Sequence, residues 1–237
     1  MSVCWRSGAI DIGGGDCLSL GLATSGVVVA LMAVLAWLLS RHYALHRRTH
    51  TLWWAVSFWL AFIAAATDFS SHITGHWGLL QYRVYLFSAA TLVTYMGAGT
   101  VYLFSRRFGH IYVALMSLFA LAMARALYVT PISAIHMLPA GEKAQGFVPS
   151  SLAPYFGILS GVGALALFAG ALYSYLRTRA AYNLWIALGA LIFSAGGAVG
   201  ELAGVYELFY VFQAVGSLVL YLGVVGSFSG NRTSGKI

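Results

Sequence analysis

Long apolar runs separated by short polar turns are the dominant pattern of this chain. Each run is about 20 residues or longer, which is the length that an α-helix needs to cross a bilayer at a rise of 1.5 Å per residue. Apolar and polar residues do not alternate along these runs as they do in the strands of a membrane β-barrel. The pattern predicts about seven spanning helices, at 20–40, 51–70, 79–104, 110–129, 152–176, 181–201 and 205–228.

The helices predicted over 20–104 have counterparts of similar character over 152–228. Leu52-Trp53-Trp54 opens a helix in the first copy, and Leu184-Trp185-Ile186 opens one in the second. Aromatic residues then open the next helix in each copy, namely Tyr82, Tyr85 and Phe87 in the first and Tyr206, Phe209, Tyr210 and Phe212 in the second. The offset is about 131 to 133 residues for the first helix pair and about 124 to 126 for the second. We therefore predict one all-α domain over 1–237, made of two parallel three-helix repeats joined by a linker helix over 110–129.

The composition places this chain in a bilayer, because 60% of its residues are hydrophobic and only 8% are charged. Its net charge of +7 would suggest nucleic acid binding in a soluble protein, but here the positive charges lie in particular connections between the predicted helices. Basic residues follow every second predicted helix, as Arg41, Arg47, Arg48, Arg106, Arg107, Arg177, Arg179, Arg232 and Lys236. The other connections carry all six acidic residues. The positive-inside rule then predicts a multi-pass protein of the cell membrane, with its N-terminus outside, its C-terminus inside, and membrane lipids rather than nucleic acid as partners.

The segment before the first predicted helix contains both cysteines, Cys4 and Cys17, and is expected to lie outside. An oxidising compartment permits a disulfide there, although two ordinary thiols fit the sequence equally well. Asp11 and Asp16 stand where a cleavable signal peptide would carry a basic region, so we expect the first helix to be retained as a span.

Charged residues gather at the predicted outer ends of five helices, as Asp68, Arg83, Arg125, Glu201 and Glu207. Charges near the membrane are costly unless they pair or face water. One hypothesis is an outward-facing polar vestibule in which Arg83 and Arg125 pair with Asp68, Glu201 or Glu207. The alternative is that all five are ordinary interfacial residues that reach headgroups and water.

Metal and cofactor chemistry has few candidate residues in this sequence. Asp68, His72 and His76 follow one another at helical spacing and could ligate a metal ion, although Gly75 weakens any helix that would carry all three. A polar interfacial cap is the alternative. Lys143 and Lys236 are the only lysines and lie outside the predicted spans, so the chain lacks the lysine that holds retinal. No histidine lies near the centre of a predicted span to ligate haem, and no catalytic motif is present, so we do not expect an enzyme.

Small and hydroxyl residues suggest where helices pack and where a solute could bind. Gly157 and Gly161 form a small-xxx-small face suited to close helix packing. A solute site between the repeats would be lined by the small faces of the predicted helices 152–176 and 181–201 and by polar groups, namely Ser88, Thr91, Gln213 and Ser217. The long connection 131–151 could cover the mouth of the bundle as a lid, or serve as a solvated linker.

The order of three helices, one linker helix and three helices, with the N-terminus outside, resembles the seven-helix group of transporters, opsins and receptors. The chain is also similar to small uncharacterised prokaryotic integral membrane proteins. The first resemblance implies parallel repeats about an axis along the membrane normal. The leading hypothesis is a small-solute or ion transporter. Its alternatives are a receptor-like or accessory subunit that docks partners through Gly- and Ala-rich faces, either as a homo-oligomer or with another membrane subunit, and a membrane metalloenzyme using Asp68, His72, His76 and Glu201.

Overall fold

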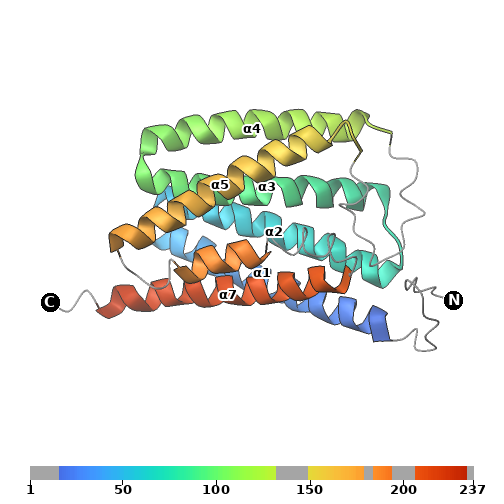
Figure 1. Ribbon diagram of the computed structural model, residues 1–237, viewed down its shortest axis with the longest axis horizontal. Helices are drawn as coiled ribbons and strands as arrows, with labels where there is room; N and C mark the ends of the chain where they lie inside the picture. The colour runs from blue at the N-terminus through green and yellow to red at the C-terminus, as the bar shows by residue number, and fades with distance from the viewer. Residues whose placement is uncertain (1–15, 132–148, 179–183, 194–205, 234–237) are drawn as a thin grey trace.

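The regular elements of this computed structural model are helices, and it describes residues 16–131, 149–178, 184–193 and 206–233 (Figure 1). The helices are α1 (Asp16–His46), α2 (Thr49–Thr74), α3 (Leu79–Phe104), α4 (Arg106–Val129), α5 (Ala153–Thr178), the helix Leu184–Phe193 and α7 (Tyr206–Thr233). The prediction of an all-α chain with seven helices is confirmed at this level.

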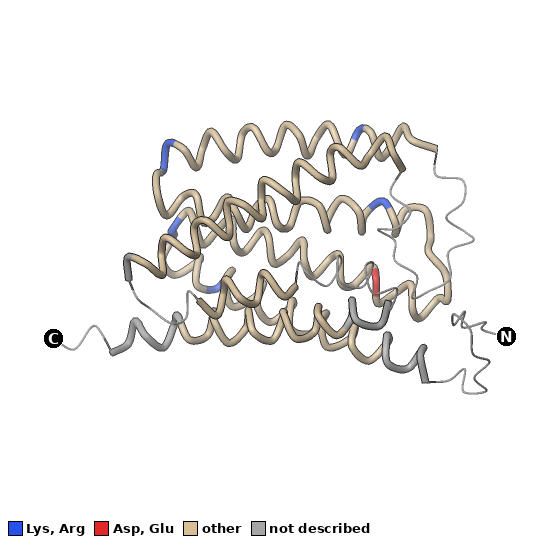
Figure 2. Tube along the Cα trace, in the orientation of Figure 1, with Lys and Arg blue, Asp and Glu red and all other residues tan. Residues whose placement is uncertain are grey.

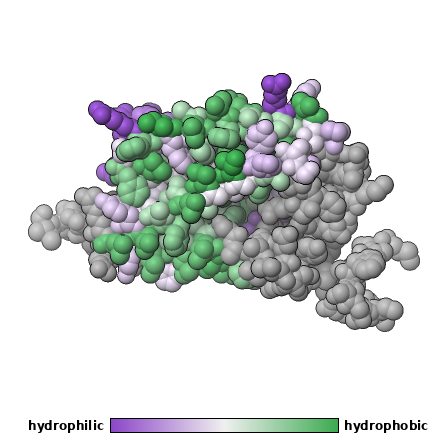
Figure 3. Space-filling view, turned by 45° about the horizontal axis from the view of Figure 1, so that its top comes forward, coloured by the Kyte–Doolittle hydropathy of each residue, from purple (hydrophilic) through white to green (hydrophobic). Residues whose placement is uncertain are grey.

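Five of these helices are long and apolar enough to cross a membrane, namely α1 to α5. The last two contribute shorter apolar helical stretches, Leu184–Phe193 and, within α7, Val211–Gly226. Large apolar side chains also cover the outside of the bundle, as the hydrophobic residues of Figure 3 show. On α4, for example, Leu118 is 66% exposed and Leu121 is 69% exposed. Such a surface is consistent with an integral membrane protein, in which lipid covers the outer faces.

Short turns with defined backbone geometry set the helix ends. Arg47 has φ 51° and connects α1 to α2 within two residues. Gly75 has φ 75° and ends α2, as expected for the left-handed position that favours glycine. The backbone N–H of Gly78 then donates to Gln81 Oε1 at 3.0 Å, which caps the start of α3. The predicted range 79–104 is confirmed for α3, whereas the helices over 20–40 and 110–129 begin earlier than predicted.

The α3 helix lies at the centre of the bundle and packs against α2, α4 and α5, while α1 packs against α2 and α7 (Figure 1). Hydrogen bonds join α3 to two of these neighbours, α2 and α5. Ser57 Oγ on α2 donates to the Leu92 carbonyl at 2.6 Å, and Thr94 Oγ1 donates to the Leu159 carbonyl of α5 at 2.7 Å. These bonds fix α2 and α5 on α3, because a hydroxyl inside a bilayer has no water to bind instead.

A close backbone contact between α3 and α5 is made at Gly97 and Gly163, and not at the pair Gly157 and Gly161 that the sequence suggested. A Cβ atom on Gly163 would lie 2.6 Å from the Thr94 backbone nitrogen, and one on Gly97 would lie 2.7 Å from the Gly163 carbonyl oxygen. In contrast, no atom of a described residue lies within 4 Å of a Cβ added to Gly157 or Gly161. The prediction that Gly157 and Gly161 form a helix-packing face is therefore wrong as far as the described residues show, because none of them packs closely against either glycine.

Candidate functional site

A cavity of about 330 Å³ lies between the first three helices and the last three. It is lined by Val28 of α1, by Ala61, Ala64 and Ala65 of α2, by Tyr85, Ala89, Leu92 and Val93 of α3, by Phe156, Ser160, Gly161 and Ala164 of α5, and by Phe193 and Gln213. A volume of this size falls at the lower end of the range for small-molecule sites. The bundle therefore contains room for a small ligand.

The cavity exists because α2 and α5 present small side chains to each other. Three alanines on α2 recur at helical spacing, and Gly161 and Ala164 lie on the facing side of α5. Gln213 and the small face of the 152–176 helix were predicted to line a solute site, and Gln213, Gly161 and Ala164 line this cavity. The binding of a solute there stays a prediction.

Three hydroxyl residues predicted to line the site, Ser88, Thr91 and Ser217, are absent from the described lining. All three are buried, and two of them bond to their own helix. Thr91 Oγ1 donates to the Phe87 carbonyl at 2.7 Å, and Ser217 Oγ donates to the Gln213 carbonyl at 2.6 Å. A hydroxyl satisfied by the preceding turn has no need of water or ligand. Ser160, which the sequence analysis did not single out, lines the cavity instead.

Aromatic rings supply much of the cavity wall and were also missed as site residues. Tyr85, Phe156 and Phe193 come from three different helices. For Tyr85 the sequence signal was the group of aromatic residues that opens the 79–104 helix. That group marks the helix without showing which of its rings point inward. The described lining therefore combines apolar and aromatic surface with a few neutral polar groups.

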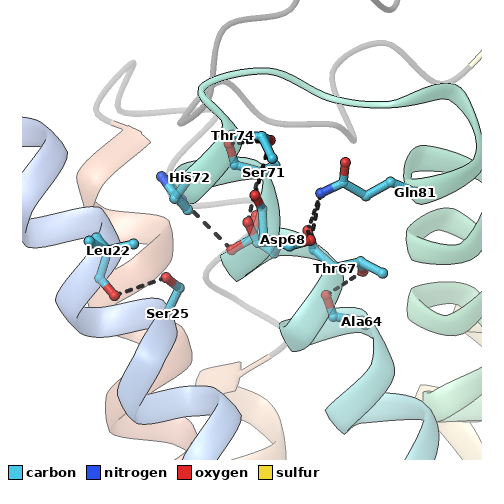
Figure 4. A network of polar contacts seen from close by, with 10 residues as sticks. Leu22, Ser25, Ala64, Thr67, Asp68, Ser71, His72, Thr74 and Gln81 are labelled. Atoms are coloured by element: carbon cyan, nitrogen blue, oxygen red, sulfur yellow. Dashed lines mark hydrogen bonds and ion pairs between the residues drawn. The ribbon is translucent and has the colours of Figure 1, made fainter.

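Asp68 lies on α2, one turn beyond Ala64 and Ala65 on the same helix face. It is only 7% exposed, and its Oδ2 atom lies 3.9 Å from Nε2 of His72 (Figure 4). That separation is within ion-pair range but beyond a hydrogen bond. The backbone carbonyl of Asp68 accepts from Ser71 Oγ at 2.7 Å. A buried carboxylate thus lies one helical turn from two cavity-lining residues, toward the end of the bundle formed by the α2–α3 turn.

Gln81 holds the helical turn that carries Asp68 (Figure 4). Its Nε2 atom donates to the Thr67 carbonyl at 2.8 Å and to Ser70 Oγ at 2.7 Å, while its Oε1 atom accepts from Gly78 N. One amide therefore ties the first turn of α3 to the last turns of α2. We expect this clamp to fix the position of the Asp68 backbone, because both of its α2 contacts lie within two residues of it.

The two arginines of the proposed vestibule lie at the same end of the bundle but do not pair with Asp68. The guanidinium of Arg83 donates to the Tyr128 and Thr130 carbonyls, at 3.3 and 3.4 Å. These carbonyls end α4, where a positive charge is favourable. Arg125 is exposed on α4. Among the described residues, the one ion pair within 4.0 Å is Asp68–His72 (Figure 2 shows the positions of the charged residues).

Several predicted residues lie outside the part of the chain that is described. These are Glu201, the side chain of Glu207, the cysteines Cys4 and Cys17 as a pair, and most of the connection 131–151. Pairing of either arginine with Glu201 or Glu207 and the disulfide therefore stay predictions.

The metal candidates do not converge in the described structure. His76 is exposed beyond the left-handed turn at Gly75, and its Nδ1 atom lies 2.9 Å from the Thr74 carbonyl. Because Gly75 ends α2, His76 does not continue the helix face that carries Asp68 and His72. No group of three His, Cys, Asp or Glu side chains among the described residues could hold a metal ion.

Comparison with protein-family models, curated proteins and solved structures finds no match to this chain.

Proposed function

We propose that this chain is a multi-pass protein of the cell membrane that transports a small solute or ion through the cavity between its two halves. The observation that carries the proposal is the position of this cavity, which has walls from α1, α2 and α3 on one side and from α5, Phe193 and α7 on the other. Transporters built from repeats place their substrate at such an interface. A site there can open to either side as one half moves against the other.

The contacts between neighbouring helices support two parallel repeats. A Cβ atom on Gly99 of α3 would meet Trp54 of α2, and one on Gly223 of α7 would meet Ile186 of the helix Leu184–Phe193. Gly223 follows Gly99 by 124 residues, and Ile186 follows Trp54 by 132, which are the offsets of the predicted repeat. Two helix pairs with the same register at these offsets are what a duplication would produce.

The same offsets also relate residues around the cavity. Gly216 of α7 packs against Phe193, and the residues at the repeat offsets are Leu92 and Ala61. Ala61, Leu92 and Phe193 all line the cavity. Positions related by the proposed repeat thus contribute to one site from both halves, as the 3+1+3 resemblance implies.

The charge distribution supports an orientation with the N-terminus outside. Arginines cluster at the end of the bundle opposite the α2–α3 turn, as Arg41, Arg47, Arg48, Arg106 and Arg107. Under the positive-inside rule this end faces the cytoplasm. Asp68 and the adjoining end of the cavity would then face outward, as expected for an entrance.

Thiol accessibility tests the transport proposal without knowledge of the substrate. In a background with Cys4→Ser and Cys17→Ser, Ser160→Cys places one thiol in the cavity and Ser88→Cys places one in packed protein. A membrane-impermeant thiol reagent is applied to right-side-out spheroplasts and to inside-out vesicles. We expect the cavity thiol to react from both sides and the control thiol from neither.

The other outcomes separate the alternative functions. Reaction of Ser160→Cys from one side only would favour the receptor-like alternative, whose ligand site has one entrance. Reaction from neither side would mean a dry cavity and would support an accessory subunit held together by packing. Either result would reject the transporter proposal, because alternating access requires water to reach the site from each side.

A further inference from the structure

Asp68 is not among the described lining residues of the cavity, but it lies on the same face of α2, one helical turn beyond Ala64 and Ala65, which are. Ala61, Ala65, Asp68 and His72 follow one another at spacings of three and four residues, so they share one buried face of α2. Asp68 is one helical turn, about 5.4 Å along the axis, beyond the alanines that line the cavity. On α1, Ser25 and Val28 are related in the same way, with Val28 in the cavity wall and Ser25 beside the Asp68–His72 pair (Figure 4).

Among the described residues, His72 is the one ionisable partner of Asp68 within 4.0 Å. His72 Nε2 is 3.9 Å away and carries charge only when it is protonated. Arg83 of α3 bonds to the end of α4, and Ser25 Oγ of α1 donates to the Leu22 carbonyl rather than to the carboxylate. A carboxylate kept within a membrane helix without a full partner is costly, and such residues mark ion or substrate paths.

The described wall of the cavity suits an apolar ligand body and carries no positive charge that would repel a cation. Its aromatic rings, Tyr85, Phe156 and Phe193, can attract a positive charge through their faces. Ser160 and Gln213 are neutral, and no Lys or Arg is among its described lining residues. An anionic ligand would meet Asp68 at one end and find no described positive group in the wall.

We propose that the cavity binds a small organic cation, with its apolar body among the aromatic rings and its ammonium group next to Asp68. This inference rests on the proposed function and names the substrate class for the same site. The bound cation supplies the charge that the buried carboxylate lacks. His72, when protonated, would compete with it for the same carboxylate.

Three probes of similar size test the charge requirement. Phenethylamine is a cation, 2-phenylethanol is its neutral analogue, and phenylacetate is an anion with the same ring. Isothermal titration of the detergent-purified full chain measures their affinities. We expect the amine to bind at least about tenfold more tightly than the alcohol, and the anion to bind least, because charge pairing and cation–π attraction act only on the amine.

Four variants assign this preference to the proposed residues. Asp68→Asn should lower the affinity for the amine to that for the alcohol, and Asp68→Glu should retain the preference. Gly161→Leu should abolish binding of both, because its side chain enters the cavity, whereas Gly157→Leu is the matched control on the same helix outside the described lining. Retained alcohol binding by Asp68→Asn shows that this variant is folded.

The outcomes distinguish this inference from the transport proposal. Equal affinities for amine and alcohol, both lost in Gly161→Leu, would overturn the cation inference while leaving the cavity as a binding site. An amine preference that survives Asp68→Asn would remove Asp68 from the site. Failure of the folded wild-type chain to bind the amine would also overturn the inference, whereas the transport proposal depends on the thiol accessibility result alone.

Discussion

Enlarging Gly163 by one methyl group should separate α5 from α3. The added Cβ would lie 2.6 Å from the Thr94 nitrogen and 2.7 Å from its Cα, whereas ordinary contact begins at 3.4 Å. The backbone of α3 cannot turn aside as a flexible side chain could, so α5 must move away by about 0.8 Å. This movement would also strain the bond from Thr94 Oγ1 to the Leu159 carbonyl, which is now 2.7 Å long.

The expected cost follows from these two effects. Overpacking by a methyl group costs about 1–3 kcal/mol, and an interhelical hydrogen bond in a membrane protein contributes about 0.6 kcal/mol. Gly163→Ala should therefore lower the free energy of unfolding by about 2–4 kcal/mol. For a chain of this size each kcal/mol corresponds to about 2–4 °C, so the melting temperature should fall by about 4–16 °C.

Gly157→Ala provides the control for this substitution. It adds the same methyl group to the same helix, but no atom of a described residue lies within 4 Å of the new Cβ. Both variants share any gain in helix propensity, so that gain cancels in the comparison. Thermal unfolding is followed by fluorescence in a mild detergent. Equal melting temperatures for the two variants would refute the inferred α3–α5 contact.

Three further substitutions test other contacts by the same thermal measurement. Thr94→Val removes the hydroxyl that bonds to Leu159 without adding volume, so its cost of about 0.6 kcal/mol should be well below that of the glycine substitution; a larger loss would contradict the packing argument. Gln81→Leu removes the clamp between α2 and α3 and should cost about 1–3 kcal/mol of stability. An unchanged melting temperature would show that these hydrogen bonds do not stabilise the α2–α3 turn. Arg83→Leu removes the donor to the last carbonyls of α4 and should destabilise the chain by about 1 kcal/mol more than Arg125→Leu, which alters an exposed arginine at the same end; similar losses would argue against that contact.

The candidate site was predictable in position but only partly in composition. Gln213, Gly161 and Ala164 belong to the groups expected to line a solute site, and they line the cavity. Sequence alone could not separate Ser160, which lines it, from Ser88, which is buried away from its described wall. Both are serines in apolar helices, and their roles depend on whether a neighbouring helix or empty space lies opposite.

The partners of charged residues also depended on the tertiary structure. Asp68, Arg83 and Arg125 were correctly expected at one end of the bundle, because helix length fixes which residues share a level. One of the two hypotheses paired these opposite charges, yet among the described residues Arg83 binds carbonyls at the end of α4 rather than Asp68. The last carbonyls of a helix have no partner within it, so they compete with carboxylates for a guanidinium that the fold brings close to them.

The membrane class and the helices follow from the sequence, because a span is specified by the length of its apolar run and by the turns at its ends. The range 79–104 was predicted correctly on that basis. Which face of each helix points inward depends on how the helices pack, as the buried Gly163 and the exposed Gly157 of α5 illustrate. In a bilayer the lipid-facing and protein-facing sides are both apolar, so hydrophobic periodicity does not distinguish them, and close packing makes the choice.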